Sequence, residues 1–155
     1  MDSTYYPDWL YRDLVENELP WNSATAFAFE DFLLTYTLHD SSWVGVFSNC
    51  RLDDAVTLCI VWDRVWLPEE LKRELSGIPH WPFLFVRIEG VTRLSFKSYD
   101  DIGLVGRTIA DCEVSSVEHG RLVTVADIFG GRVEFEFVGL TRFLGFSHDK
   151  QLLPI

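Results

Sequence analysis

The chain of 155 residues is poor in cysteine and contains no long apolar run. Its three cysteines, Cys50, Cys59 and Cys112, are odd in number and form no C-x-x-C pair. This argues against a disulfide framework or a zinc knuckle and favours a reducing, cytoplasmic location. No apolar run approaches the roughly 18 residues of a membrane-spanning helix, and no basic and apolar leader opens the chain. We therefore expect a cytoplasmic protein that does not bind membranes.

Basic residues are also scarce. The chain has 13 lysines and arginines against 24 acidic residues, for a formal net charge of -11. A polyanion would be repelled by this average field, so we expect no nucleic-acid partner, whereas a basic protein would be attracted. Apolar residues make up 48% of the chain and aromatic residues 15%, which predicts one packed domain over residues 1–155 rather than a disordered chain.

Motifs of nucleotide-binding, calcium-binding and hydrolytic sites are missing, including G-x-S-x-G, the P-loop and H-E-x-x-H. The stretch His39-Asp40-Ser41 has the residue types of a hydrolase triad, but three neighbours cannot converge as nucleophile, base and orienting group. We interpret it as a structural junction. His39 would bind a free carbonyl at the end of a helix, and Asp40 and Ser41 would accept backbone N–H groups in the following turn. We predict neither catalysis nor a cofactor.

Two His-Asp pairs, His39-Asp40 and His148-Asp149, leave one enzymatic alternative open. If the two segments met, their side chains could form a metal site or bind a small ligand. The pairs lack the i, i+4 spacing that places two ligands on one helix face. We expect the Cys59 and Cys112 thiols to be packed in apolar surroundings rather than reactive.

Hydrophobic periodicity predicts helices first and strands afterwards. The apolar residues Phe29, Phe32, Leu33 and Tyr36 share one helical face, and Ser23 could cap that helix as Asp8 could cap an earlier one. Glycine turns near His119-Gly120 and Gly130-Gly131 indicate a meander. The predicted helices cover 8–19, 23–36 and 67–75, and the predicted strands cover 43–48, 55–62, 83–88, 91–97, 107–117, 122–129 and 132–138. We expect an α+β fold in which N-terminal helices pack on a curved, mainly antiparallel sheet of about seven strands.

The N-terminal segment combines acidic and aromatic side chains and contains only one basic residue, Arg12, up to residue 31. Such a surface suits contact with a cationic protein. The candidate partner-binding residues are Tyr5, Tyr6, Asp8, Trp9, Asp13, Glu16 and Glu18. The alternative is an amphipathic helix that packs Trp9, Leu10, Leu14 and Val15 on the sheet.

Two short segments carry a family resemblance: Leu38-His39-Asp40-Ser41 at the end of a predicted helix, and Phe85-Val86-Arg87-Ile88-Glu89-Gly90-Val91 in the strands. With the glycine-turn meander, the chain from Phe29 to Phe137 resembles in outline the small bacterial "LHDS"-type α+β proteins, which include predicted immunity proteins of polymorphic toxin systems. The resemblance implies a cytoplasmic protein that binds and neutralises a toxin, and it implies no catalytic residue.

These observations lead to one preferred function and two alternatives. We predict a non-enzymatic protein-binding domain, most concretely an immunity-type inhibitor of a basic toxin such as a nuclease. The first alternative is the small-ligand or metal-dependent enzyme that uses His39, Asp40, His148 and Asp149. The second is a structural or oligomeric module in which an exposed edge strand pairs with that of a second copy.

Overall fold

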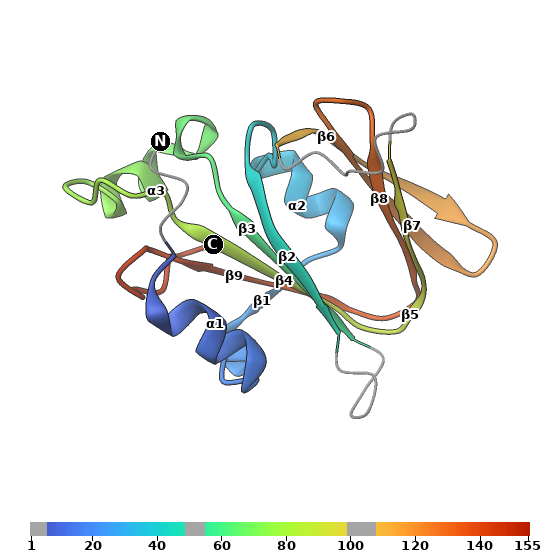
Figure 1. Cartoon of the computed structure of the whole chain (residues 1–155), viewed down its shortest axis with the longest axis horizontal. Helices are drawn as coiled ribbons and strands as arrows, with labels where there is room; N and C mark the ends of the chain where they lie inside the picture. Colours follow the sequence, from blue (N-terminus) through green and yellow to red (C-terminus); the bar gives the residue numbers. More distant parts are fainter. Residues whose placement is uncertain (1–5, 49–54, 99–107) are drawn as a thin grey trace.

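The computed structural model describes residues 6–48, 55–98 and 108–155, and these residues form two antiparallel sheets. The strand order is β1-β9-β4-β3-β2 in the five-stranded sheet and β5-β8-β7-β6 in the four-stranded sheet (Figure 1). The first contains β1 (Thr25–Ala26), β2 (Ser42–Ser48), β3 (Val56–Val61), β4 (Phe83–Ile88) and β9 (Thr141–Phe146). The second contains β5 (Val91–Lys97), β6 (Ile109–Val117), β7 (Gly120–Asp127) and β8 (Arg132–Phe137). The α+β class and the antiparallel pairing are confirmed, but two sheets replace the single sheet of about seven strands.

The main core lies between the two sheets. Helix α2 (Phe29–Thr35) is enclosed there, and its Phe32 ring stacks on Phe143 of β9 with centroids 4.0 Å apart (Figure 1). One face of β3, formed by Val56, Leu58 and Ile60, points into this core together with Trp62 beyond the strand's end, as the period of two predicts. The four-stranded sheet contributes its own inner residues, such as Phe135.

A second core covers the other face of the five-stranded sheet. Helix α1 (Asp8–Val15) packs Trp9, Leu10 and Leu14 against strand residues that include Phe83 and Phe85. The amphipathic-helix prediction is therefore confirmed for these three side chains. It is wrong for Val15, the last residue of the helix, which is 75% exposed.

The helix predicted over 23–36 is too long. Trp21–Ser23 forms a 3₁₀ turn (η1), Thr25–Ala26 forms β1, and α2 begins only at Phe29, with Ala28 at the cap position in place of Ser23. Thr25 and Ala26 pair instead with β9, and the Phe27 N–H donates to the Thr141 carbonyl. These hydrogen bonds to a neighbouring strand outweigh local helix propensity. Likewise, Pro7 rather than Asp8 occupies the cap position of α1.

The consecutive strands β4 and β5 belong to different sheets, and the chain crosses between them at Glu89-Gly90. Gly90 has a φ of +67°, and a Cβ atom there would lie 2.9 Å from the backbone nitrogen of Gly139. The Gly139 N–H donates to the Glu89 carbonyl, so the return crossing from β8 to β9 lies against the outgoing one. Glycine is needed at this corner because two backbones meet there.

The predicted hairpins and the third helix are confirmed, but the last strand was missed. Pairing of β2 with β3, β6 with β7 and β7 with β8 confirms the predicted hairpins, and α3 (Glu69–Glu74) lies within the helix predicted over 67–75. Strand β9 was not predicted, although it lies between β4 and β1. The turn over 49–54 and the loop over 99–106 lie outside the described residues. In the part of the chain that is described, no helix has the length and apolar character needed to span a membrane.

Candidate functional site

The Leu38–Ser42 turn joins the starts of two strands that belong to different sheets. The Asp40 N–H donates to the Ile109 carbonyl, and the Ile109 N–H donates to the Ser41 carbonyl. Ser42 at the start of β2 also forms a bridge with Thr108, just before β6. Asp40 has a φ of +63°, a left-handed conformation that aspartate tolerates better than most residues. The turn therefore connects the five-stranded sheet to the four-stranded sheet.

The side chains of this turn point to different neighbours. The Ser41 hydroxyl is buried and accepts the Asp63 N–H at 2.9 Å. The His39 Nδ1 atom lies 2.8 Å from the Ala110 carbonyl, which can only accept, so Nδ1 carries the proton. His39 thus binds strand β6 and not the end of α2, where we expected its partner. Ser41 and His39 do not face one another, and the three residues do not form a catalytic triad.

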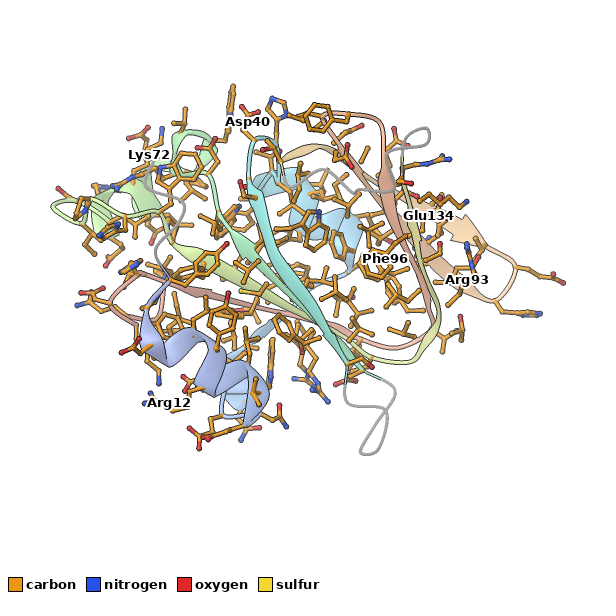
Figure 2. All side chains as sticks on the ribbon, in the orientation of Figure 1. Arg12, Asp40, Lys72, Arg93, Phe96 and Glu134 are labelled. Atoms are coloured by element: carbon orange, nitrogen blue, oxygen red, sulfur yellow. The ribbon has the colours of Figure 1, made fainter. Side chains whose placement is uncertain are left out.

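Asp40 and His39 fix the position of an exposed tryptophan. The Trp66 indole N–H donates to Asp40 Oδ2 at 3.3 Å, and the rings of His39 and Trp66 lie 5.6 Å apart. The His39 Nε2 atom lies 3.5 Å from the same carboxylate oxygen. Trp66 ends the 3₁₀ turn η2 (Arg64–Trp66) and is 50% exposed. A large aromatic side chain is therefore held at the surface beside the carboxylate of Asp40. Figure 2 shows Asp40 at the edge of the molecule.

A second carboxylate lies beneath this one. Asp63 is buried, and its Oδ1 accepts the Val65 N–H at 2.8 Å at the start of η2. Burial raises the pKa of Asp63, and the negative charge of Asp40 adds to the increase. The hydrogen bond from Val65 and the nearby His39 act in the opposite direction without cancelling it. The local field favours a positive group at this position.

The turn between β7 and β8 lies at the same edge of the molecule (Figure 1). It carries two more apolar residues, Ile128 and Phe129. The buried Asp127 carboxylate accepts the N–H groups of Phe129 and Gly131 at 2.7 and 3.1 Å, which fixes the turn. The Ile128 N–H donates to the Thr108 carbonyl, beside the Leu38–Ser42 turn. Ile128 and Phe129 are more than half exposed.

We define the junction surface as His39, Asp40, Val65, Trp66, Ile128 and Phe129. All four of its apolar residues are at least half exposed, and three separate segments contribute to it. Of these six residues, only His39 and Asp40 were candidates from the sequence pattern. The available signals were the apolar run Val65-Trp66-Leu67 between Arg64 and Pro68 and the Asp127…Gly130-Gly131 turn, but neither reveals that these segments meet.

The N-terminal candidates are only partly exposed. Tyr5 lies outside the described residues, and Tyr6 and Trp9 are half-buried against Phe83. Asp13 is buried, with Lys150 Nζ 2.6 Å and Arg12 Nε 3.4 Å from its carboxylate, so it cannot offer an exposed contact. The exposed carboxylates of this set are Asp8, Glu16 and Glu18.

The structure does not group His39, Asp40, His148 and Asp149, all of them described residues, into a metal site. His148 stacks on His80 with ring centroids 4.2 Å apart, and Asp149 accepts the Ser147 hydroxyl beyond the end of β9. His39 and Asp40 are held instead between β6 and η2. Over residues 6–48, 55–98 and 108–155, no three His, Cys, Asp or Glu side chains are grouped so that they could hold a metal ion.

Two further features bear on chemistry. Burial raises the pKa of the Cys59 thiol well above its usual range, and burial together with Asp111 and Glu113 raises the pKa of Cys112 to about 12. Both thiols therefore stay protonated at neutral pH. A hollow of about 310 Å³ lies near the start of α2, and Glu30 and Arg121 pair at its wall. Neither His-Asp pair lines this hollow.

Comparison of the chain with protein-family models, with curated proteins and with solved structures finds no match.

Proposed function

We propose that the chain is a protein-binding domain that uses the junction surface to bind a basic protein. The observation that carries the proposal is Trp66, a half-exposed tryptophan that is fixed by Asp40 and His39. Tryptophan is enriched among the residues that dominate binding energy at protein interfaces. A side chain already held in one orientation loses little conformational entropy on binding.

The charge of the surface supports a cationic partner. The six residues include one carboxylate and no lysine or arginine, and the buried Asp63 adds a second negative charge below them. An arginine or lysine of the partner would pair with Asp40 and contact the face of the Trp66 ring, a combination of ion pair and cation–π contact. The overall charge of -11 would speed the encounter.

The most concrete form of this proposal is an immunity-type inhibitor of a basic toxin. The resemblance carried by Leu38-His39-Asp40-Ser41 supports it, because this motif forms the turn that holds Trp66 in place. In this proposal the motif has a structural role that supports binding indirectly, and the toxin contacts the residues around it. An acidic inhibitor suits a nuclease, whose substrate-binding surface is basic.

The test is recovery of a partner by the immobilised chain from native lysate, followed by titration calorimetry of the purified pair. We expect a basic protein that binds at low salt and weakens as salt rises. Trp66→Ala should weaken binding by about tenfold or more, as expected for a central aromatic residue. Asp40→Asn should weaken it less and reduce its salt dependence.

Matched controls separate this surface from the others. Phe96→Ala removes an exposed aromatic side chain from β5, and Glu136→Gln removes a charge from β8. Neither should change the affinity. The double variant Glu16→Gln/Glu18→Gln tests the N-terminal segment as the contact surface. Failure to recover any basic partner at low salt, or equal losses for Trp66→Ala and Phe96→Ala, would contradict the proposal.

A further inference from the structure

Strand β2 is a long edge strand with no charged residue. Its sequence, Ser-Trp-Val-Gly-Val-Phe-Ser, contains only apolar residues between two serines. It lies at the end of the five-stranded sheet, and among the strands of the described residues it pairs only with β3. Apart from the Ser42–Thr108 bridge at its start, no hydrogen bond joins the outer edge of Trp43–Phe47 to the rest of the described chain.

The other edge strands carry the features that prevent strand addition. Strand β5 carries Arg93 and Lys97, and β6 carries Asp111 and Glu113, while β1 is only two residues long. Charged side chains and short length are the usual protection of a sheet edge. Strand β2 has only a bulge between Trp43 and Gly45. Among these four edges it is therefore the one suited to receive another strand.

The side chains of β2 are half-exposed on both faces of the sheet. Trp43 and Val46 pack at the border of the core between the sheets, and Val44 and Phe47 pack at the border of the α1 core. An added strand with apolar residues on both faces would extend both cores.

We propose that two copies of this chain associate through antiparallel pairing of β2 with β2, in a twofold-symmetric dimer. A strand that extends both cores must be apolar on both faces and uncharged. Strand β2 itself has this composition. A basic segment would find no countercharge along Trp43–Phe47. Twofold symmetry pairs a surface with itself, so a self-complementary strand closes the assembly at two copies.

This dimer has an unusual salt dependence. Each copy carries a net charge of -11, so the two copies repel each other, while the contact between them contains no charge. Salt screens the repulsion and leaves the apolar and backbone contacts in place. Dimerisation should therefore strengthen as salt rises, whereas binding of a basic partner should weaken. The two salt dependences allow failure of one proposal to be distinguished from failure of the other.

The test is analytical ultracentrifugation of the full chain over a range of protein and salt concentrations. We expect a monomer–dimer equilibrium that shifts toward dimer with salt. Val44→Lys should raise the dimer dissociation constant at least about tenfold, because it brings two like charges together at the centre of the contact. Val114→Lys is the matched control, since it changes a half-buried valine on the charged edge strand β6, and it should leave the dissociation constant unchanged.

A second measurement uses the unaltered chain, in case Val44→Lys fails to fold. In the dimer, the backbone amides of Trp43–Phe47 that face outward should become protected from hydrogen exchange as protein concentration rises, while those of β5 should not change. A chain that stays monomeric at every concentration and salt level would overturn the proposal. So would a dimer without this concentration-dependent protection, or one formed equally well by a folded Val44→Lys variant.

Discussion

In the described part of the chain, the five-stranded sheet is covered on both faces, whereas the four-stranded sheet is covered on one. Strand β4 sends Leu84, Val86 and Ile88 into the core between the sheets and Phe83 and Phe85 into the core beneath α1. Strand β8 sends Val133, Phe135 and Phe137 into the first core, but its alternate residues Glu134 and Glu136 form ion pairs on the outer face. Figure 2 shows Glu134 near Arg93 on that side of the molecule.

This difference explains the sequence patterns of the two sheets. A strand buried on both faces has an almost continuous apolar sequence, such as Phe83–Ile88, while a strand buried on one face alternates, as Arg132–Phe137 does. The difference also predicts where substitutions are tolerated. Changes on either face of the five-stranded sheet should be costly, and changes on the outer face of the four-stranded sheet should be mild.

The largest expected effect is at Phe85, on the face of β4 that points away from the four-stranded sheet. Its ring is fully buried and lies 5.9 Å from that of Phe146 and 6.2 Å from that of Trp9. We expect Phe85→Ala to lower the free energy of unfolding by about 3–5 kcal/mol, the usual cost of such a cavity. Denaturant unfolding measures it. Glu136→Ala on β8 is the control, and a similar loss there would remove the distinction between the sheets.

The next effect concerns the ion pair that joins α1 to the chain beyond β9. Lys150 Nζ lies 2.6 Å from the buried carboxylate of Asp13. Lys150→Met should cost about 2 kcal/mol, because it leaves the buried carboxylate with Arg12 as its one cationic neighbour among the described residues, and half-exposed Lys150 is partly screened by solvent. The double variant Asp13→Asn/Lys150→Met should recover part of the loss in chemical denaturation. A single variant as stable as the unaltered chain would show that α1 does not need this pair.

The comparison also shows why the sequence predicted one sheet better than the other. The glycine turns and alternating residues of β7 and β8 are local signals, and the structure confirms both hairpins. Strand β9, Thr-Arg-Phe-Leu-Gly-Phe, lacks alternation because both of its faces are buried, so its pairing with β4 and β1 has no local signature. The separation into two sheets depends on the crossing at Gly90 and Gly139, two backbones that are distant in sequence.

The same limit applies to the junction surface. The residue types of His39-Asp40-Ser41 were enough to predict a turn and to reject a triad. Their partners, Ala110, Trp66 and Asp63, come from later segments and are brought together only by the meeting of the two sheets. Burial of Asp13 could not be predicted from the sequence either, because its partner Lys150 is distant along the chain.

A moderate effect is expected at Ser41, where the two sheets are joined. Its hydroxyl accepts the buried Asp63 N–H, and Ser41→Ala leaves that donor without a partner. We expect a loss of about 1–2 kcal/mol in the free energy of unfolding, the usual penalty for an unsatisfied buried group. Ser115→Ala on the exposed face of β6 should change it little. Equal unfolding midpoints for the two variants in thermal melts would argue against a stabilising role for the Ser41 bond.

The smallest effect lies on the outer face of the four-stranded sheet, at Glu134. Burial alone would raise its pKa, but the hydrogen bond from Lys97 and the charges of Lys97, Arg132 and Arg93 outweigh burial and hold the pKa below its ordinary value. The native state therefore favours the ionised carboxylate, and Glu134→Gln should cost less than about 1 kcal/mol at neutral pH. This stabilisation is fully present above the ordinary pKa of glutamate, near about 4.3, and is lost as pH falls through the lowered pKa.

Urea unfolding of the unaltered chain and of Glu134→Gln from neutral to acid pH measures this difference. The two curves should converge at low pH, and high salt should narrow their separation at neutral pH because salt screens the ion pairs. Glu113→Gln is the matched control. Glu113 is exposed on β6, on the same face of the sheet as Glu134, and it lies opposite Thr124. If the two unfolding free energies still differ below the lowered pKa, Glu134 stabilises the outer face by packing. The contrast between a charged and an apolar sheet face would then be weaker than the ion pairs indicate.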